Sequence, residues 1–142
     1  MLERSIEVNA PIETVYGVIS DLESYPEFLS TTKSVKLKKL NSGCDAEFKI
    51  NVIKDISYTL RFRFDPPREL HWAFIKGELM KENRGAWLLE PIGETKTKAI
   101  YQIDVRFGWM VPKLIVKKLT ETQLPQLLAS FKKRAEQFSE EG

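Results

Sequence analysis

Thr97 to Phe107 reads TKAIYQIDVRF and contains the longest inward–outward alternation in the chain. The residue types suited to a sheet interior recur at every second position: Thr97, Ala99, Tyr101, Ile103, Val105 and Phe107. Charged or polar side chains hold most of the positions between them. Since successive side chains of a strand point to opposite faces, this stretch predicts a β-strand with one buried face and one face in solvent.

The same period of two extends upstream over much of the chain. Residues 46–52 and 56–64 both alternate, and Lys54-Asp55 between them predicts a tight hairpin turn. Residues from about 35 to 107 therefore predict a run of about six antiparallel strands, apolar on one face and polar on the other.

The N-terminal part of the chain changes from one period to another. Residues 2–9 predict a first strand. From Pro11 to Ile19 the apolar residues take the spacing of one buried helix face. Residues 21–29 predict an irregular segment or a short second helix.

A helical pattern returns in residues 112–138, after Gly108 and Pro112 end the last strand. Its apolar stripe consists of Leu124, Leu127, Leu128, Phe131, Ala135 and Phe138. Pro125 lies inside this pattern and removes one helix hydrogen bond. We therefore expect a kink near residues 121–122 or two abutting helices.

This order of elements predicts an α+β fold, with a curved antiparallel sheet of about six to seven strands wrapped around the long C-terminal helix. The apolar face of such a sheet has to be covered, and the C-terminal stripe is the only predicted element large enough to cover it. No repeat or linker interrupts the pattern, so residues 1–142 are predicted to form a single domain.

Composition narrows the class of protein. Hydrophobic residues make up 42% of the chain and charged residues 30%, as in globular soluble domains. The net charge of +2 gives no argument for a nucleic-acid partner. Cys44 is the only cysteine, and no apolar run suggests a signal peptide or a membrane span, so we expect a cytoplasmic protein. The polar outer face of the predicted sheet favours a monomer.

Two motifs carry a family resemblance. Residues 15–29, VYGVISDLESYPEFL, match the pattern V-x-x-V-x-x-D-x-x-x-Y-P-x-F-[LV], and residues 85–91, GAWLLEP, match G-x-W-x-[FL]-x-P. With the closing helix of residues 112–138, the chain resembles the START-like (SRPBCC, helix-grip) superfamily, and within it the polyketide cyclase/dehydrase and coenzyme Q-binding group. The resemblance implies a cavity between the sheet and the long helix that holds a lipid, quinone, isoprenoid or polyketide-like molecule.

The candidate ligand-contacting residues are mainly aromatic residues of the inner sheet face and apolar residues near the long helix. They are Tyr25, Phe28, Phe48, Tyr58, Leu60, Phe62, Trp72, Phe74, Trp87, Tyr101, Ile103, Trp109, Leu114 and Leu128. For Tyr25 and Phe28 we favour packing over ligand contact. The alternative for the whole set is that these side chains fill the space and close the core. The hydroxyls of Tyr58 and Tyr101 either anchor a ligand or find partners in protein or water.

Catalytic and metal-binding signals are weak. His71, the only histidine, is out of phase with the inward residues Leu70 and Trp72, and Cys44 has no companion ligands. We predict no catalytic residue, no metal and no cofactor, and we favour binding or transport of an apolar small molecule over catalysis. One alternative is a cyclase or dehydratase that uses Tyr58, Tyr101 or His71. Another is a ribosome- or protein-interaction module, as in the toxin-like branch of the group.

A basic and apolar segment begins the C-terminal helical region. Lys113, Lys117 and Lys118 stand near Trp109 and Leu114. One interpretation is transient contact with an anionic membrane surface through Trp109 and the three lysines. The other, which we favour, is a solvated helix start with Trp109 packed on the end of the sheet.

Overall fold

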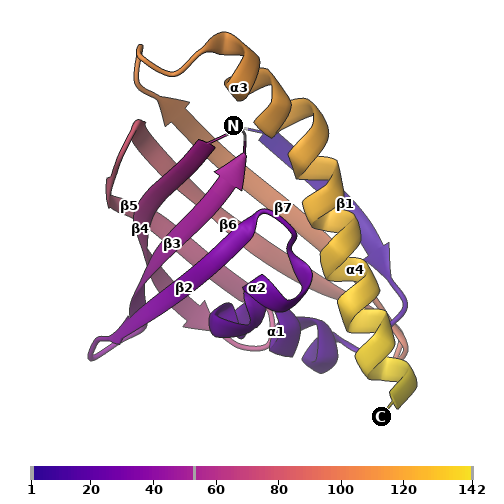
Figure 1. Ribbon diagram of the computed structural model, residues 1–142. Helices are drawn as coiled ribbons and strands as arrows, with labels where there is room; N and C mark the ends of the chain where they lie inside the picture. The colour runs from indigo at the N-terminus through magenta and orange to yellow at the C-terminus, as the bar shows by residue number, and fades with distance from the viewer. Residues whose placement is uncertain (1, 53, 142) are drawn as a thin grey trace.

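The computed structural model describes residues 2–52 and 54–141, and Figure 1 shows their arrangement. The N-terminal elements are β1 (Leu2–Val8), α1 (Ile12–Ser20), the short 3-10 helix η1 (Leu22–Ser24) and α2 (Tyr25–Phe28). Six strands follow: β2 (Thr32–Lys39), β3 (Cys44–Val52), β4 (Lys54–Asp65), β5 (Glu69–Gly77), β6 (Met80–Ile92) and β7 (Lys96–Phe107). The C-terminal region holds α3 (Lys113–Lys118), the π-helical segment η2 (Leu119–Gln123) and α4 (Leu124–Glu141).

All seven strands form one antiparallel sheet in the order β1-β7-β6-β5-β4-β3-β2. The strands β2 to β7 pair with their neighbours in sequence, whereas β1 pairs with β7 at the far edge, with Leu2 opposite Ile103 and Val8 opposite Thr97. The sheet curves around the C-terminal helix, with α1 and α2 at one end of the hollow (Figure 1). The predicted helix-grip architecture is confirmed.

The long helix α4 is held against the inside of the sheet by its apolar stripe. Leu128, Phe131 and Ala135 are buried, and the Phe131 ring meets the Trp87 ring edge-on, with 5.2 Å between centroids. Each large aromatic side chain buried in this way makes a substantial contribution to stability. Phe138 lies near the end of the helix and is 42% exposed, so the stripe no longer faces the core there.

The C-terminal helical region is divided into α3 and α4 by a π-helical segment, Leu119–Gln123, which includes residues 121–122, where a kink or a boundary between two helices was predicted. Pro125 has no N–H to donate to the carbonyl of Glu121, which lies within that segment. Such one-turn π segments are a known way for a helix to absorb a missing hydrogen bond.

Two further predictions have different outcomes. The segment after α1 is a pair of short helices, η1 and α2, which agrees with one of the two predicted forms. The predicted tight hairpin between the two alternating runs is present, because β3 and β4 pair antiparallel with Val52 opposite Lys54. Lys54 and Asp55 are paired residues of β4, however, and do not form its turn. Within the described residues, no helix is both long enough and apolar enough to cross a bilayer.

Candidate functional site

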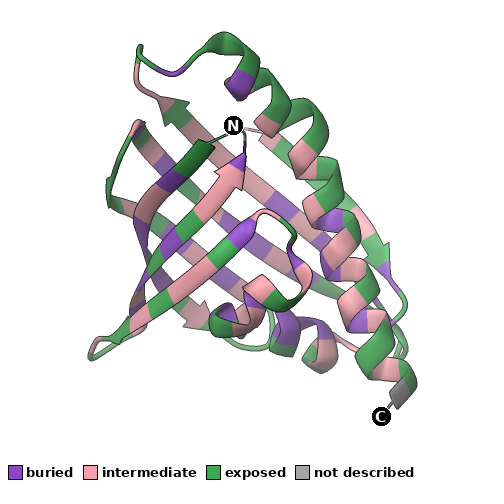
Figure 2. Ribbon diagram, viewed as in Figure 1, coloured by how far each residue is buried: buried purple, intermediate pink, exposed green. Residues whose placement is uncertain are grey.

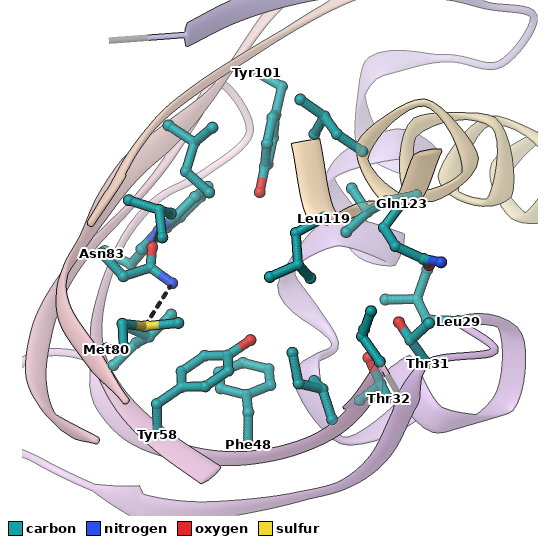
Figure 3. Close-up of a pocket in the computed structure, with 18 of the residues that line it drawn as sticks. Leu29, Thr31, Thr32, Phe48, Tyr58, Met80, Asn83, Tyr101, Leu119 and Gln123 are labelled. Atoms are coloured by element: carbon teal, nitrogen blue, oxygen red, sulfur yellow. Dashed lines mark hydrogen bonds between the residues drawn. The ribbon is translucent and has the colours of Figure 1, made fainter. Parts of the chain in front are cut away.

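A cavity of about 330 Å³ lies between the sheet, the π-helical segment and α4, at the lower end of the range typical of ligand pockets. Figure 3 shows its inside, with side chains from the curved sheet on one side and from the helix and the loop before β2 on the other. The lining is mostly apolar, and its helical and loop part consists of Tyr25, Leu29, Thr31, Leu119, Thr120, Gln123, Leu124, Leu127 and Phe131. The cavity shows that the aromatic residues of the inner face do not close the core.

Many of the predicted ligand-contacting residues come together around this cavity. Those that line it are Tyr25, Phe48, Tyr58, Leu60, Phe62, Trp72, Trp87, Tyr101 and Ile103. They were found from sequence because each lies on the inward phase of a strand, apart from Tyr25, which belongs to the motif before β2. Their contact with a ligand stays a prediction.

Three of the predicted residues are packed elsewhere. Phe28 meets the Phe131 ring edge-on at 5.1 Å and lies under the Arg134 guanidinium, 5.2 Å from its carbon. Leu128 faces a separate small hollow between α4, α1 and the sheet. Phe74 pairs with Leu60 and packs beside Gly77 instead of lining the cavity. All three residues lie outside the cavity lining, because helix rotation and local packing decide which side chains reach the space. For Phe28 this agrees with the favoured interpretation, in which the ring packs within the protein.

Trp109 and Leu114 are also outside the lining, because they point into solvent. Trp109 is 86% exposed, so the favoured interpretation, in which it packs on the end of the sheet, is wrong. Val111 and Ile115 take the buried positions of this segment instead. The exposed stretch near α3 is visible in Figure 2.

The aromatic residues of the sheet support one another as a continuous wall. Phe48 stacks on Tyr58 at 5.4 Å, Trp72 lies 5.6 Å from Tyr101, and Tyr101 lies 4.7 Å from Trp87. Aromatic contacts at these distances add to the stability from burial alone. The rings therefore hold each other at the edge of the cavity and leave its middle open.

Gly85 makes room for part of this wall. A Cβ atom at this position would lie 2.6 Å from the Trp72 ring and 2.2 Å from the carbonyl oxygen of Gln102. The glycine of the G-x-W motif thus lets the Trp72 indole lie against the backbone of β6. This close approach fixes where the indole N–H points.

A polar group on β6 was missed by the sequence analysis. The Trp72 indole N–H donates to Asn83 Oδ1 over 3.0 Å, and Asn83 Nδ2 lies 3.7 Å from the sulfur of Met80. Counting back from Trp87 in steps of two places Asn83 on the inner face, so this residue had a usable signal. The alternation of β6 could not place Met80 on the inner face, because the pairing register shifts between Met80 and Glu82.

The two cavity tyrosines present free hydroxyls. Tyr58 and Tyr101 direct their hydroxyls into the cavity in Figure 3, and neither has a hydrogen-bond partner among the described residues. Burial raises the pKa of both hydroxyls, so they stay protonated at neutral pH. Tyr25 differs, since its hydroxyl donates to the carbonyl oxygen of Ile19.

Charged groups lie mainly outside the cavity. Among the described residues that line the cavity, Asp104 alone is charged, and its carboxylate pairs with Arg84 over 3.4 Å. His71 is outside the lining, with Nε2 2.7 Å from the Glu69 carboxylate. No three His, Cys, Asp or Glu side chains gather as a metal site in the part of the chain that the structure describes.

Comparisons with known proteins agree with this architecture. The model of the family "Polyketide cyclase / dehydrase and lipid transport" matches residues 8–132. An uncharacterised 17.2 kDa protein of Streptomyces lincolnensis is 24% identical over 99% of this chain and 92% of its own length.

Solved structures show the same fold. The Zhui aromatase/cyclase of Streptomyces sp. R1128 superimposes with a TM-score of 0.85 at 16% identity, over 96% of this chain and 93% of that one. A START superfamily protein of Mycobacterium smegmatis gives a TM-score of 0.83 at 22% identity, over 96% and 97% of the two chains.

Proposed function

The chain belongs to the polyketide cyclase/dehydrase and lipid transport family, and from that premise we propose that it binds and carries a largely apolar small molecule in the cavity between sheet and helix. The observation that carries the proposal is the open, mostly apolar space of about 330 Å³ behind the Trp72–Tyr101–Trp87 wall. A lipid, quinone, isoprenoid or polyketide-like molecule would meet the same wall.

The expected driving force is burial of apolar ligand surface. Enclosing about 300 Å² of such surface contributes about 7 kcal/mol at about 25 cal/mol per Å². Association then costs several kcal/mol of lost freedom, which leaves a few kcal/mol, or about millimolar binding, for a ligand that buries only this much surface. Tighter binding requires a ligand that buries a larger apolar area.

The test is a titration with N-phenyl-1-naphthylamine, a neutral dye that becomes fluorescent in apolar surroundings. Ile103→Trp fills the cavity, because Ile103 lies in its wall. Ile92→Trp is the matched control, because Ile92 is 41% exposed and lies outside the lining. We expect saturable dye binding by the wild type and by Ile92→Trp, and a loss of at least tenfold in affinity for Ile103→Trp. Equal binding by all three folded proteins would show that the dye binds elsewhere and would refute the proposal.

Catalysis as a cyclase or dehydratase is less well supported than binding and transport of an apolar molecule. The raised pKa values of Tyr58 and Tyr101 oppose their use as proton acceptors near neutral pH. His71, the third candidate, is held by Glu69 outside the cavity. The two tyrosines can still bind and orient a ligand, which is compatible with a transport function.

A second proposal concerns the segment beside the cavity: we propose that it contacts an anionic membrane surface. Trp109, Met110 and Leu114 are 86%, 68% and 70% exposed, so three apolar side chains stand in solvent within six residues of chain. Lys113, Lys117 and Lys118 are exposed next to them. Each lysine near an anionic bilayer contributes about 1 kcal/mol, and interfacial insertion of the apolar residues adds to this.

Vesicle co-sedimentation tests the membrane proposal. We expect binding to vesicles of phosphatidylcholine with 30% phosphatidylglycerol, weaker binding to pure phosphatidylcholine, and a decrease with added salt. Trp109→Ser should reduce binding severalfold, whereas the control Ile75→Ser, at another exposed apolar position, should not. Equal sedimentation of all three proteins with both vesicle types would overturn the membrane proposal.

The interaction of the same basic segment with a ribosome stays a prediction. Ribosome co-sedimentation of the wild type and of the charge-reversed lysine variant tests it.

A further inference from the structure

Three hydrogen-bond donors line one side of the cavity. Tyr58 comes from β4, Asn83 from β6 and Tyr101 from β7, and Figure 3 shows their polar atoms directed into the same space. Every fully buried side-chain nitrogen or oxygen of the described residues has a partner. The two tyrosine hydroxyls have none there, so they are in contact with the cavity space itself and not sealed in the core.

The third donor is the side-chain amide of Asn83. Its oxygen is occupied by the Trp72 indole N–H at 3.0 Å, which fixes the orientation of the amide. Its nitrogen carries two hydrogens and meets only the sulfur of Met80, at 3.7 Å. A thioether is a weak acceptor, so the Asn83 N–H groups are available to a stronger one.

The charge of the cavity lining favours a neutral hydrogen-bond acceptor on the ligand over a negatively charged one. Asp104, the only charged residue of the described lining, is negative and paired with Arg84. A carboxylate or phosphate in this space would be buried without a counter-charge, which is strongly unfavourable. A neutral acceptor such as a carbonyl oxygen carries no such cost and can accept from two donors.

We propose that Tyr58, Tyr101 and Asn83 form an acceptor-binding subsite that selects neutral apolar ligands with a carbonyl oxygen over hydrocarbons of the same shape. This inference rests on the proposed binding function and adds the chemical class of the ligand. Because a buried donor left unpaired is unfavourable, the subsite also disfavours ligands without an acceptor. The aromatic wall supplies affinity, and the three donors supply discrimination and orientation.

Fluorenone and fluorene are suitable probes, since they share one ring system and differ by a carbonyl in place of a methylene. Their affinities are measured by displacement of N-phenyl-1-naphthylamine from the wild type and from the double variant Tyr58→Phe/Tyr101→Phe. Tyr16→Phe is the control, because it removes the same atom from a buried tyrosine whose hydroxyl donates to the carbonyl of Glu69 outside the cavity.

We expect the wild type and Tyr16→Phe to bind fluorenone more tightly than fluorene. Each lost hydrogen bond should weaken fluorenone binding about 2- to 10-fold. Fluorene should bind the double variant at least as tightly as the wild type, because it no longer covers unpaired tyrosine hydroxyls. For Asn83→Leu, the quantity compared is the ratio of the affinities for fluorenone and fluorene, because a loss of packing weakens the binding of both probes alike. The infrared carbonyl stretch of bound fluorenone should lie below its value in hexane and move back toward that value in the double variant.

The outcomes separate this inference from the proposed function. If both probes bind the wild type equally and the double variant changes neither the ratio nor the carbonyl stretch, the subsite is refuted while apolar binding stands. If neither probe binds, the cavity does not accept apolar molecules and both proposals fail.

Discussion

Tyr25→Phe and Tyr101→Phe remove the same atom from two buried rings, and the structure predicts different consequences for stability. Both residues are less than 10% exposed, at 8% and 7%. The Tyr25 hydroxyl donates to the carbonyl of Ile19, whereas the Tyr101 hydroxyl has no acceptor among the described residues. The first hydroxyl is part of the fold, and the second is available to a ligand.

The magnitudes follow from this difference. Loss of the Tyr25 hydrogen bond leaves the Ile19 carbonyl without its partner, so the free energy of unfolding should fall by about 1–3 kcal/mol. Tyr101→Phe breaks no protein hydrogen bond and should stay within about 0.5 kcal/mol of the wild type. For a domain of this size, 1 kcal/mol corresponds to about 3–5 °C in Tm.

The assay is urea unfolding at pH 7 of the ligand-free proteins, followed by far-ultraviolet circular dichroism and analysed by linear extrapolation. Equal m-values show that the variants unfold from comparably compact states. A loss of stability for Tyr101→Phe as large as that for Tyr25→Phe would mean that the Tyr101 hydroxyl already has a partner within the protein and is not available to a ligand.

Three further variants test the packing and the surface charges. Gly85→Ala places a Cβ 2.6 Å from the Trp72 ring, so we expect a loss of about 1–3 kcal/mol and a shifted indole N–H resonance of Trp72; an unchanged resonance and stability would contradict the close packing. Phe131→Ala removes the ring that joins α4 to the wall and should cost about 3–5 kcal/mol in urea unfolding, whereas a cost below 1 kcal/mol would mean that α4 is not anchored there. The Arg61 guanidinium donates to Asp45 over 2.8 Å and lowers the pKa of that carboxyl. Because the folded pKa lies below the unfolded value of about 3.9, the stability difference between wild type and Asp45→Asn should be present above about pH 4 and should disappear as the pH falls below it; a difference that persists at low pH would contradict the pair.

The sheet could be predicted from the sequence because its two faces differ. A one-sided sheet forces strict alternation, as in residues 97–107, and this alternation also placed Tyr101 and Ile103 in the cavity wall. The same counting would have found Asn83, two steps before Trp87. It was missed because an asparagine between charged residues resembles an exposed position.

Other features depend on information that periodicity does not carry. A register shift after Met80 reverses which side chains face inward, and nothing in the residue types announces it. In the segment before α3, Val111 and Trp109 are both apolar, and only the path of the chain decides that Val111 is buried and Trp109 exposed. The cytoplasmic location, the monomeric state and coenzyme Q binding stay predictions.

Native mass spectrometry of the protein, purified from the cells that produce it, shows whether the cavity holds a ligand. We expect an apolar adduct at a ratio of one molecule per chain, released on denaturing extraction and absent from Ile103→Trp but retained by Ile92→Trp. A carbonyl in the released molecule would support the donor subsite as well. A protein mass without adduct, unchanged after incubation with fluorenone, quinones and lipids, would contradict the proposed binding of an apolar molecule in the cavity.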